Sequence, residues 1–224
     1  MPLSNNILSF LFNMQLPFAL PNGIDVLDVH KDAAVRNACT TFYKSFYHDS
    51  RPRHLLLGIN PGRFGGGITG IPFTDPIRLQ QDCGIENNFQ KKQELSSVFI
   101  YDMIQAFGGP QAFYSRFYIS SISPLGFIKD GRNLNYYDDA HLKNKIEPFV
   151  IQCINTQLRW GLIRDVCFCI GEGENLKYLK ALNQKNKWFN TVQGLPHPRF
   201  IMQYKLKQKQ KYLDNYLAYL QAAS

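Results

Sequence analysis

A glycine-rich loop is the part of the chain whose residue types and spacing most directly suggest chemistry. It runs from Gly58 to Phe73, directly after a short apolar run. Glycine lets backbone N–H groups approach an anion closely, so such a loop invites a phosphate-binding interpretation. A Walker loop, however, needs Gly-Lys-Ser or Gly-Lys-Thr at the start of a helix, and the chain has no such tripeptide. The loop therefore does not predict nucleotide binding.

A second glycine cluster, Gly171-Glu172-Gly173, does not predict dinucleotide binding either. It lacks the third glycine of the dinucleotide fingerprint and has an acid where a pyrophosphate would bind. We expect no nucleotide cofactor.

Hydrophobic patterning predicts the elements that must position these loops. Apolar runs bounded by turn residues predict strands over residues 54–59, 117–122 and 165–170, and a fourth short strand is expected over residues 191–195. Helical spacing predicts helices over residues 24–47, 94–107, 138–160, 174–182 and 204–222. Strands that alternate with long helices indicate an α/β fold, with a mostly parallel central sheet of about four strands and helices on both faces. We expect one domain over residues 1–224, with residues 1–50 as a helical N-terminal extension.

Ligands of such sheets bind beyond the carboxyl ends of the strands. Three loops should therefore converge on one cleft: the loop from residue 60 onward, residues 120–127 and residues 196–200.

The first of these loops resembles the first active-site motif of the single-strand-selective monofunctional uracil-DNA glycosylases, the SMUG branch of the uracil-DNA glycosylase superfamily. That motif reads Gly-Met-Asn-Pro-Gly-Pro-Phe-Gly, then three variable residues, then Thr-Gly-Val-Pro-Phe. The residues in register here are Gly58, Asn60, Pro61, Gly62, Phe64, Gly65, Thr69, Gly70, Pro72 and Phe73. Residues 120–125 resemble the family's base-reading strand end, and residues 195–199 its second catalytic motif. The resemblance does not cover the first fifty residues.

Two departures from the family pattern leave alternatives open. Ser121 stands where the family has Asn, and the second motif is two residues shorter than the family's His-Pro-Ser-Pro-Arg-Asn. One alignment places His197 at the histidine position, and another places Leu195 there. We prefer His197, because its imidazole is a group that the chemistry can use.

The resemblance implies hydrolysis of an N-glycosidic bond, in which positive charge builds on the sugar and negative charge on the departing base. The carbonyl of Asn60 can accept a hydrogen bond from water and hold it against the anomeric carbon. His197 can donate a hydrogen bond to the base carbonyl where negative charge accumulates. We expect these two residues to be catalytic. No lysine occupies a motif position in the three loops, so we expect an intact abasic site as the product.

Base recognition requires further groups. A base inside a duplex must be extruded into a pocket and stacked on an aromatic ring, and we expect Phe73 to provide this ring. Ile59, Gly62 and Ser121 are expected to contact the base. Because Ser121 offers a single rotatable hydroxyl, we expect looser selectivity than the family's Asn gives, extending from uracil to other deaminated bases such as xanthine.

The charge of the chain agrees with DNA as the partner, single- or double-stranded. Lys and Arg number 25 against 17 Asp and Glu, which gives a formal net charge of +8. Arg199 and Phe200 suit a wedge that fills the gap left by an extruded nucleotide, and Arg63 suits a phosphate contact. The alternative is a basic enzyme whose cations coat solvated helix faces.

The cysteines and the N-terminal segment bear on the cellular location of the protein. The cysteines are odd in number and contain no CxxC pair, which argues against a disulfide framework and a zinc site; they are Cys39, Cys83, Cys153, Cys167 and Cys169. Cys167 and Cys169 alternate onto one face of a strand and should be buried. Residues 1–20 are typical of neither a signal peptide nor a membrane span. We expect a cytoplasmic monomer without metal, cofactor or membrane contact.

Three other interpretations remain at this point. A catalytically silent DNA-binding protein of the same fold would keep the basic cleft. A small-molecule hydrolase would pair His197 with Ser121 or Ser123, although the chain has no Gly-x-Ser-x-Gly elbow. A mismatch-specific uracil/thymine glycosylase would differ in its second motif.

Overall fold

The computed structural model describes residues 1–223, and a four-stranded parallel sheet lies at its centre. The strand order β3-β2-β6-β7 confirms the predicted fold class. The strands are β2 (His54–Gly58), β3 (Phe117–Ser121), β6 (Val166–Ile170) and β7 (Thr191–Leu195). Strand β2 is buried along its whole length because it pairs on both sides, with β3 and with β6.

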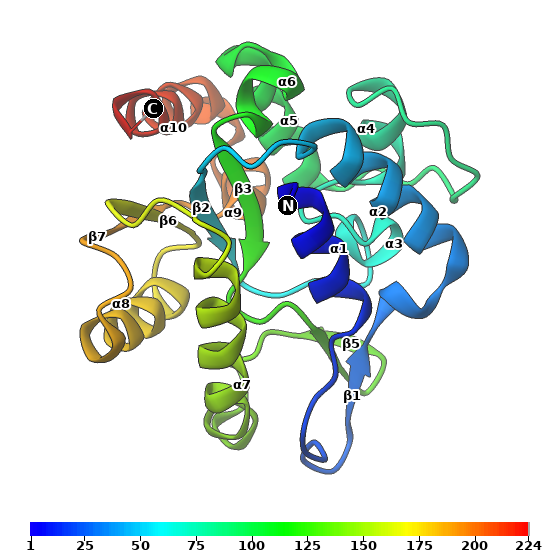
Figure 1. Ribbon diagram of the computed structural model, residues 1–224, viewed down its shortest axis with the longest axis vertical. Helices are drawn as coiled ribbons and strands as arrows, with labels where there is room; N and C mark the ends of the chain where they lie inside the picture. Colours follow the sequence, from blue (N-terminus) through cyan, green and yellow to red (C-terminus); the bar gives the residue numbers. More distant parts are fainter. Residues whose placement is uncertain (224) are drawn as a thin grey trace.

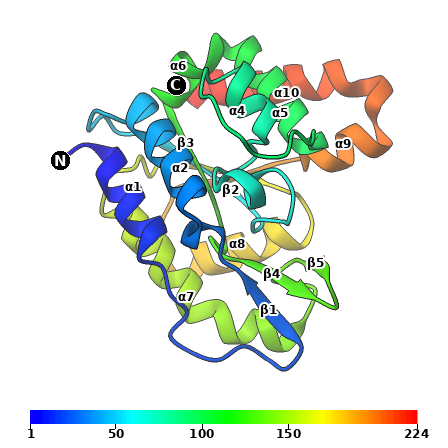
Figure 2. The same ribbon diagram turned by 90° about the vertical axis from the view of Figure 1, so that its right-hand side faces the viewer.

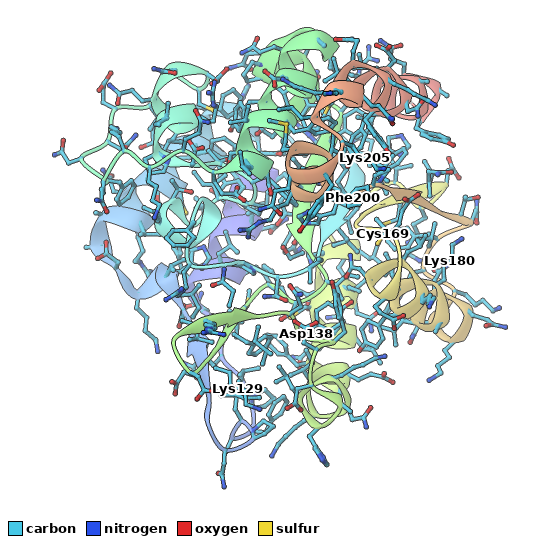
Figure 3. All side chains as sticks on the ribbon, turned by 180° about the vertical axis from the view of Figure 1, so that it is seen from behind. Lys129, Asp138, Cys169, Lys180, Phe200 and Lys205 are labelled. Atoms are coloured by element: carbon cyan, nitrogen blue, oxygen red, sulfur yellow. The ribbon has the colours of Figure 1, made fainter. Side chains whose placement is uncertain are left out.

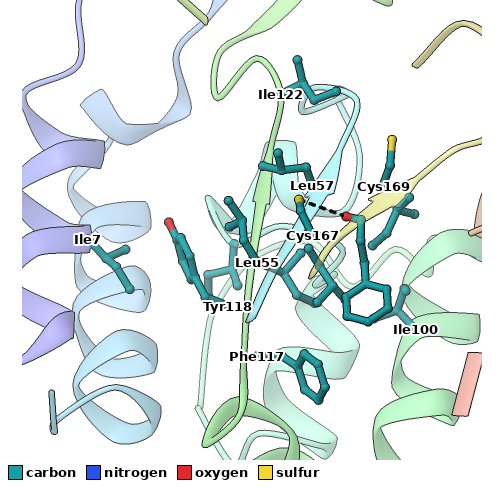
Figure 4. Close-up of a cluster of buried hydrophobic side chains, with 14 of the residues drawn as sticks. Ile7, Leu55, Leu57, Ile100, Phe117, Tyr118, Ile122, Cys167 and Cys169 are labelled. Carbon is teal, nitrogen blue, oxygen red and sulfur yellow. Dashed lines mark hydrogen bonds between the residues drawn. The ribbon is translucent and has the colours of Figure 1, made fainter. Parts of the chain in front are cut away.

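Helices cover both faces of this sheet (Figure 1). In Figure 4, Ile7 of α1 and Ile100 of α5 lie on opposite sides of the central strands. Helix α1 packs against α2, and α10 packs against α5, where Phe99 and Tyr216 meet edge to face. These helices are α1 (Leu3–Phe12), α2 (Ala33–Phe46), α5 (Leu95–Phe107) and α10 (Lys209–Ala223).

Further helices complete the layers. Helix α8 packs against β6 and β7. Phe149 and Cys153 of α7 form a small cluster with Leu125, and Phe10 of α1 packs against this cluster. Local sequence fixes where several helices begin: Asp32, Glu94 and Asp139 each accept backbone N–H groups of the first turn that follows. The remaining helices are α3 (Gly66–Thr69), α4 (Pro76–Gln81), α6 (Gly109–Tyr114), α7 (Ala140–Leu158), α8 (Glu174–Asn186) and α9 (Pro198–Tyr204), with 3₁₀ turns η1 (Val29–Lys31) and η2 (Leu206–Gln208).

A small antiparallel sheet was not predicted. It consists of β1 (Ile24–Leu27), β4 (Gly126–Lys129) and β5 (Arg132–Leu134), in the order β1-β4-β5. Figures 1 and 2 show it at the end of the molecule opposite α6 and α10. Strand β1 pairs with β4 about a hundred residues later in the chain, so local periodicity carries no signal of that pairing. Strands β4 and β5 form a hairpin, and its Asp130-Gly131 turn is a local signal that the sequence analysis did not use.

Two helix predictions at the chain's ends were wrong in extent. Residues 24–27 form strand β1 rather than the start of a helix, and α2 begins only at Ala33. The final helix begins at Lys209 rather than near residue 204, because α9 and η2 intervene and Lys205 leaves helical geometry with φ −129°. Helix α1 lies within the N-terminal segment expected to be helical, although its bounds were not predicted, and it buries Leu3, Ile7, Leu8 and Leu11.

The other predicted strands and helices agree with the structure within a few residues, and the short helices α3, α4, α6 and α9 were not predicted. Cys167 and Cys169 are fully buried in β6, as predicted (Figure 4). None of the helices within residues 1–223 combines the length and the apolar character that a membrane span requires.

Candidate active site

A cavity of about 690 Å³ opens at the carboxyl ends of the parallel strands. The loops after β2, β3 and β7 all contribute to its wall, which confirms the predicted convergence, and the turn after β6 joins them through Gly171 and Glu172. This volume is in the range of small-molecule sites. The expected site residues that line it are Ile59, Asn60, Gly62, Phe73, Ser121, His197, Arg199 and Phe200.

The loops after β2 and β3 are held in register beyond the ends of their strands. Gly58 pairs with Ser121, and the Gly58 carbonyl then accepts the Ile122 N–H at 2.9 Å. The Ile59 carbonyl accepts the Ser123 N–H at 3.1 Å. This continued ladder makes the position of the following residue, Asn60, a consequence of the sheet itself.

Both polar atoms of the half-buried Asn60 side chain have backbone partners. Its Oδ1 accepts the Tyr136 N–H at 3.0 Å, and its Nδ2 donates to the Leu134 carbonyl at 3.2 Å and to the Pro61 carbonyl at 3.2 Å. One lone pair of Oδ1 remains for another donor. The amide therefore has a single favoured orientation in the cavity wall.

Phe73 has an unusual backbone conformation for a bulky residue, with φ +53°. The turn that imposes it is closed by Thr69, whose hydroxyl donates to the Thr74 carbonyl at 2.6 Å. The ring lies directly over Gly58, where an added Cβ would be 3.0 Å from Phe73 Cε2. Glycine at position 58 is thus what lets the aromatic ring lie against the end of β2.

His197 forms the N-cap of α9. Its Nδ1 accepts the Arg199 N–H at 3.1 Å, which places the proton of the neutral ring on Nε2. Desolvation of the ring, assisted by the neighbouring Arg199 charge, lowers the pKa of His197 to about 4. The ring centroid is 6.1 Å from that of Phe73. The site therefore contains a neutral imidazole beside the aromatic ring.

The structure also shows where the residues of the alternative interpretations lie, namely the two serines considered as nucleophiles and the leucine considered for the histidine position. Ser121 is nearly buried and lines the cavity, whereas Ser123 is fully buried and donates to the Leu125 carbonyl at 2.8 Å. Leu195 is fully buried in β7 and does not line the cavity, in contrast to His197. Within the described residues, no cluster of three or more His, Cys, Asp or Glu side chains is placed to hold a metal ion.

The mouth of the cavity combines exposed aromatic rings with cations. Phe200 and Tyr204 of α9 are 43% and 72% exposed, with ring centroids 5.9 Å apart. Across the mouth, Lys92 Nζ lies 4.0 Å from the centroid of the Phe64 ring. Figure 3 shows Phe200 on the same side of the molecule as Lys205, Asp138 and Lys129. Arg63 is exposed beside Phe64 but does not line the cavity.

Sequence reasoning missed one whole wall of the site. Asn133, Asn135 and Tyr137, from β5 and the turn that follows it, line the cavity, and Asn133 Oδ1 accepts the Arg63 N–H at 2.9 Å. Its local signals are the Asp130-Gly131 turn dipeptide directly before β5 and a run of amide and aromatic residues, Asn-Leu-Asn-Tyr-Tyr over 133–137. Nothing in its spacing connects it with a loop seventy residues earlier.

The amide of Asn60 and the neutral imidazole of His197 line the same cavity, and comparison with known proteins identifies the class of protein to which this site belongs. The model of the Uracil DNA glycosylase superfamily matches residues 45–221. The chain belongs to this superfamily and is a DNA glycosylase, a hydrolase of N-glycosyl bonds that serves base excision repair.

The crystal structure of wild-type Pedobacter heparinus SMUG2 is similar over the whole chain. The two share 44% sequence identity with a TM-score of 0.96, and the match covers 100% of this chain and 98% of that one. The comparison confirms the resemblance to the SMUG branch. It also extends to the first forty-four residues, which the superfamily match does not include.

Proposed function

We propose that the protein extrudes a deaminated base, uracil among them, from DNA into this cavity and hydrolyses its N-glycosidic bond. The observation that carries the proposal is that Asn60 and His197, from loops far apart in sequence, line one cavity together with the Phe73 ring. A monomer contains all these groups.

In the proposed reaction, water attacks the anomeric carbon as the bond to the base breaks. The free lone pair of Asn60 Oδ1 accepts a hydrogen bond from this water and fixes its approach. The water oxygen forms the new C–O bond and releases its proton to solvent. The base leaves with the bonding electron pair, and solvent protonates it after release.

His197 stabilises the departing base through a hydrogen bond to its carbonyl oxygen. The hydrogen bond from Arg199 N–H to Nδ1 leaves Nε2–H as the donor. A neutral donor suits this role because it does not have to lose a proton to the base. One preorganised donor of this kind contributes about 3 to 4 kcal/mol, or roughly a hundred- to a thousandfold in rate.

Base selectivity is assigned to Ser121. Its hydroxyl rotates to act as donor or acceptor, so it accepts bases whose edges differ in hydrogen-bonding pattern. The expected substrates are uracil and other deaminated bases such as xanthine. Substitution Ser121→Asn should narrow this range toward uracil, measured as the ratio of release rates for the two bases; an unchanged ratio would refute the role.

The mouth of the cavity is proposed to hold the DNA. Phe200 and Arg199, at the start of α9, would occupy the space left by the extruded nucleotide and contact phosphate. Lys92 and Tyr204, which the sequence did not point to, lie at the same mouth, where a cation and an exposed ring suit a phosphate and a neighbouring base. Arg63 is assigned a phosphate contact outside the cavity.

The decisive test is single-turnover release of uracil and xanthine from single- and double-stranded oligonucleotides. We expect release by the wild type and a loss of about a hundredfold or more in both Asn60→Ala and His197→Ala. His48→Ala, at an exposed histidine outside the cavity, is the matched control and should keep the wild-type rate. Failure of the wild type to release any base would overturn the proposal.

The abasic product is expected to stay intact. A lyase reaction needs an amine at the sugar, and Lys92, at the cavity mouth, lies over the Phe64 ring instead. Borohydride should therefore trap no covalent protein–DNA adduct, and a trapped adduct abolished by Lys92→Met would contradict the monofunctional assignment.

A further inference from the structure

Residues 133–136, which we call the β5 brace, contact the glycine-rich loop at several points. Leu134 and Tyr136 bond to the two ends of the Asn60 amide, and Asn133 accepts the Arg63 N–H. Of these four residues, only Asn133 has a side chain that bonds to the loop; Leu134 and Tyr136 use backbone groups. The orientation of Asn60 thus depends on where the backbone of the brace lies.

The brace is held at both of its ends. At one end, Leu134 pairs with Phe127 of β4 in the small antiparallel sheet. At the other end, the Tyr136 hydroxyl donates to Asn175 Oδ1 at 2.7 Å. Both side chains are essentially inaccessible, at 0% and 1% exposure.

Asn175 is itself fixed to the end of β6. Its Nδ2 donates to the Ile170 carbonyl at 3.2 Å and contacts Cys169 Sγ at 3.3 Å. A continuous path therefore runs from the end of β6, through Asn175 and Tyr136, to the amide of Asn60 at the end of β2. Neither Asn175 nor Tyr136 lines the cavity.

We propose that Tyr136 and Asn175 are positioning residues for glycosidic bond cleavage, which hold the Asn60 amide in its working orientation through the β5 brace. The inference rests on the proposed function, because it assigns a purpose to the orientation of Asn60. Tyr136 and Asn175 do not touch the substrate; they act on Asn60 alone.

The physical reason lies in the two ends of the amide. Turning the Asn60 amide over would place its oxygen against the Leu134 carbonyl and its NH₂ group against the Tyr136 N–H, so two favourable contacts would become two repulsive ones. The amide keeps its orientation only while the brace keeps both partners in place. Displacement of a positioning group by about 1 Å can cost about a hundredfold in rate. Loss of the buried Tyr136–Asn175 hydrogen bond, which fixes the brace, should therefore lower the rate of base release.

The test compares two Tyr→Phe substitutions. Tyr136→Phe removes the hydroxyl that anchors the brace. Tyr47→Phe is the matched control: Tyr47 is equally buried, its hydroxyl donates to the Phe117 carbonyl at 3.1 Å, and it lies outside the cavity wall. Both variants lose one buried hydrogen bond and should show a similar decrease in Tm.

The kinetic results should differ between the two variants. We expect Tyr136→Phe to lower the single-turnover rate of uracil release about tenfold or more, with Kd for the same DNA containing a non-cleavable uracil analogue unchanged within about twofold. Tyr47→Phe should keep the wild-type rate. A Tyr136→Phe rate equal to that of Tyr47→Phe would overturn the inference, as would a loss found only in Kd.

A second readout does not depend on catalysis. Exchange of the Tyr136 backbone N–H with deuterium should be faster in Tyr136→Phe than in wild type and unaffected in Tyr47→Phe. Unchanged exchange would show that the hydroxyl does not hold the brace. The double variant Tyr136→Phe/Asn175→Leu should lose no more rate than the greater of the two single losses, because the pair acts as one unit; multiplicative losses would contradict this coupling.

The outcomes separate this inference from the proposed function. If the wild type releases no base, the proposed function fails. If the wild type releases base and Tyr136→Phe matches the control, only the positioning role fails.

Discussion

Base release should not require a protonated His197, and a pH profile can show this. The Arg199 N–H donates to Nδ1, so protonation of that nitrogen would abolish the helix cap and place a second positive charge beside Arg199. These effects act together with desolvation, which is the main cause of the lowered pKa of about 4.

The free-energy cost of protonating His197 at pH 7 decides between a neutral and a cationic donor. With a pKa of about 4, only about one molecule in a thousand carries imidazolium at pH 7, and using that form would cost about 4 kcal/mol. One donor contributes about 3 to 4 kcal/mol to the transition state. A cationic mechanism would therefore lose at neutral pH as much as the hydrogen bond provides.

The assay is single-turnover uracil release between pH 5.5 and 9, with wild type, His197→Ala and His48→Ala. We expect a wild-type rate that does not fall as pH rises through this range, and a His197→Ala rate lower by a roughly constant factor of a hundred to a thousand. A wild-type rate that falls tenfold per pH unit as the pH rises through this range, with the slope lost in His197→Ala and kept in His48→Ala, would refute the neutral-donor reasoning.

Three further predictions concern the same site. Asn60→Asp would place a carboxylate oxygen where Nδ2 now donates to the Leu134 carbonyl at 3.2 Å, so single-turnover release should fall about thirty- to a hundredfold. A faster variant would show that a carboxylate acting as general base on the water replaces the positioning role of the amide. Gly58→Ala would bring a Cβ to 3.0 Å from the Phe73 ring, so release should fall about tenfold, with weaker binding of base-containing DNA in a titration. In the unfolded chain His197 takes up a proton as the pH falls below its ordinary pKa of 6.5, whereas in the folded protein it does so only near pH 4. Between these two values the unfolded state binds more protons, so the stabilising effect of His197 is lost as the pH falls from 6.5 to 4. Urea unfolding should therefore show the stability difference between wild type and His197→Ala narrowing from pH 6.5 to 4, and a gap that widens would contradict the lowered pKa.

The sequence predicted the parts of the site that depend on contiguous residues. Asn60 and Phe73 belong to one loop with a recognisable spacing, and the rule that parallel strands present their carboxyl ends together brought His197 to the same cavity. The central sheet was predicted for a similar reason, since β2, β3 and β6 are local apolar runs and β7 is a short segment that follows the next helix.

The β5 brace could not be predicted, because its role depends on backbone groups. Leu134 and Tyr136 bond to Asn60 through a carbonyl and an N–H, and every residue type supplies a carbonyl. The β4–β5 hairpin is local, but only its tertiary packing against the loop after β2 determines which of its backbone groups reach Asn60. Side-chain patterns report burial and turn chemistry, so they are silent about such contacts.

The shortened second motif becomes understandable once α9 is considered. Leu195 ends β7 inside the core, and Pro198 occupies the first turn of α9, so His197 lies at the N-cap position between a strand and a helix. In the first turn of a helix, the backbone N–H two residues after the N-cap has no partner within the helix. Here that group is the Arg199 N–H, and the His197 imidazole accepts it. The same hydrogen bond that starts the helix thus fixes the tautomer of the ring and leaves Nε2–H as its remaining donor. In a motif of this length, helix capping and presentation of the proposed donor depend on one side chain, so replacing His197 by Ala should remove both at once.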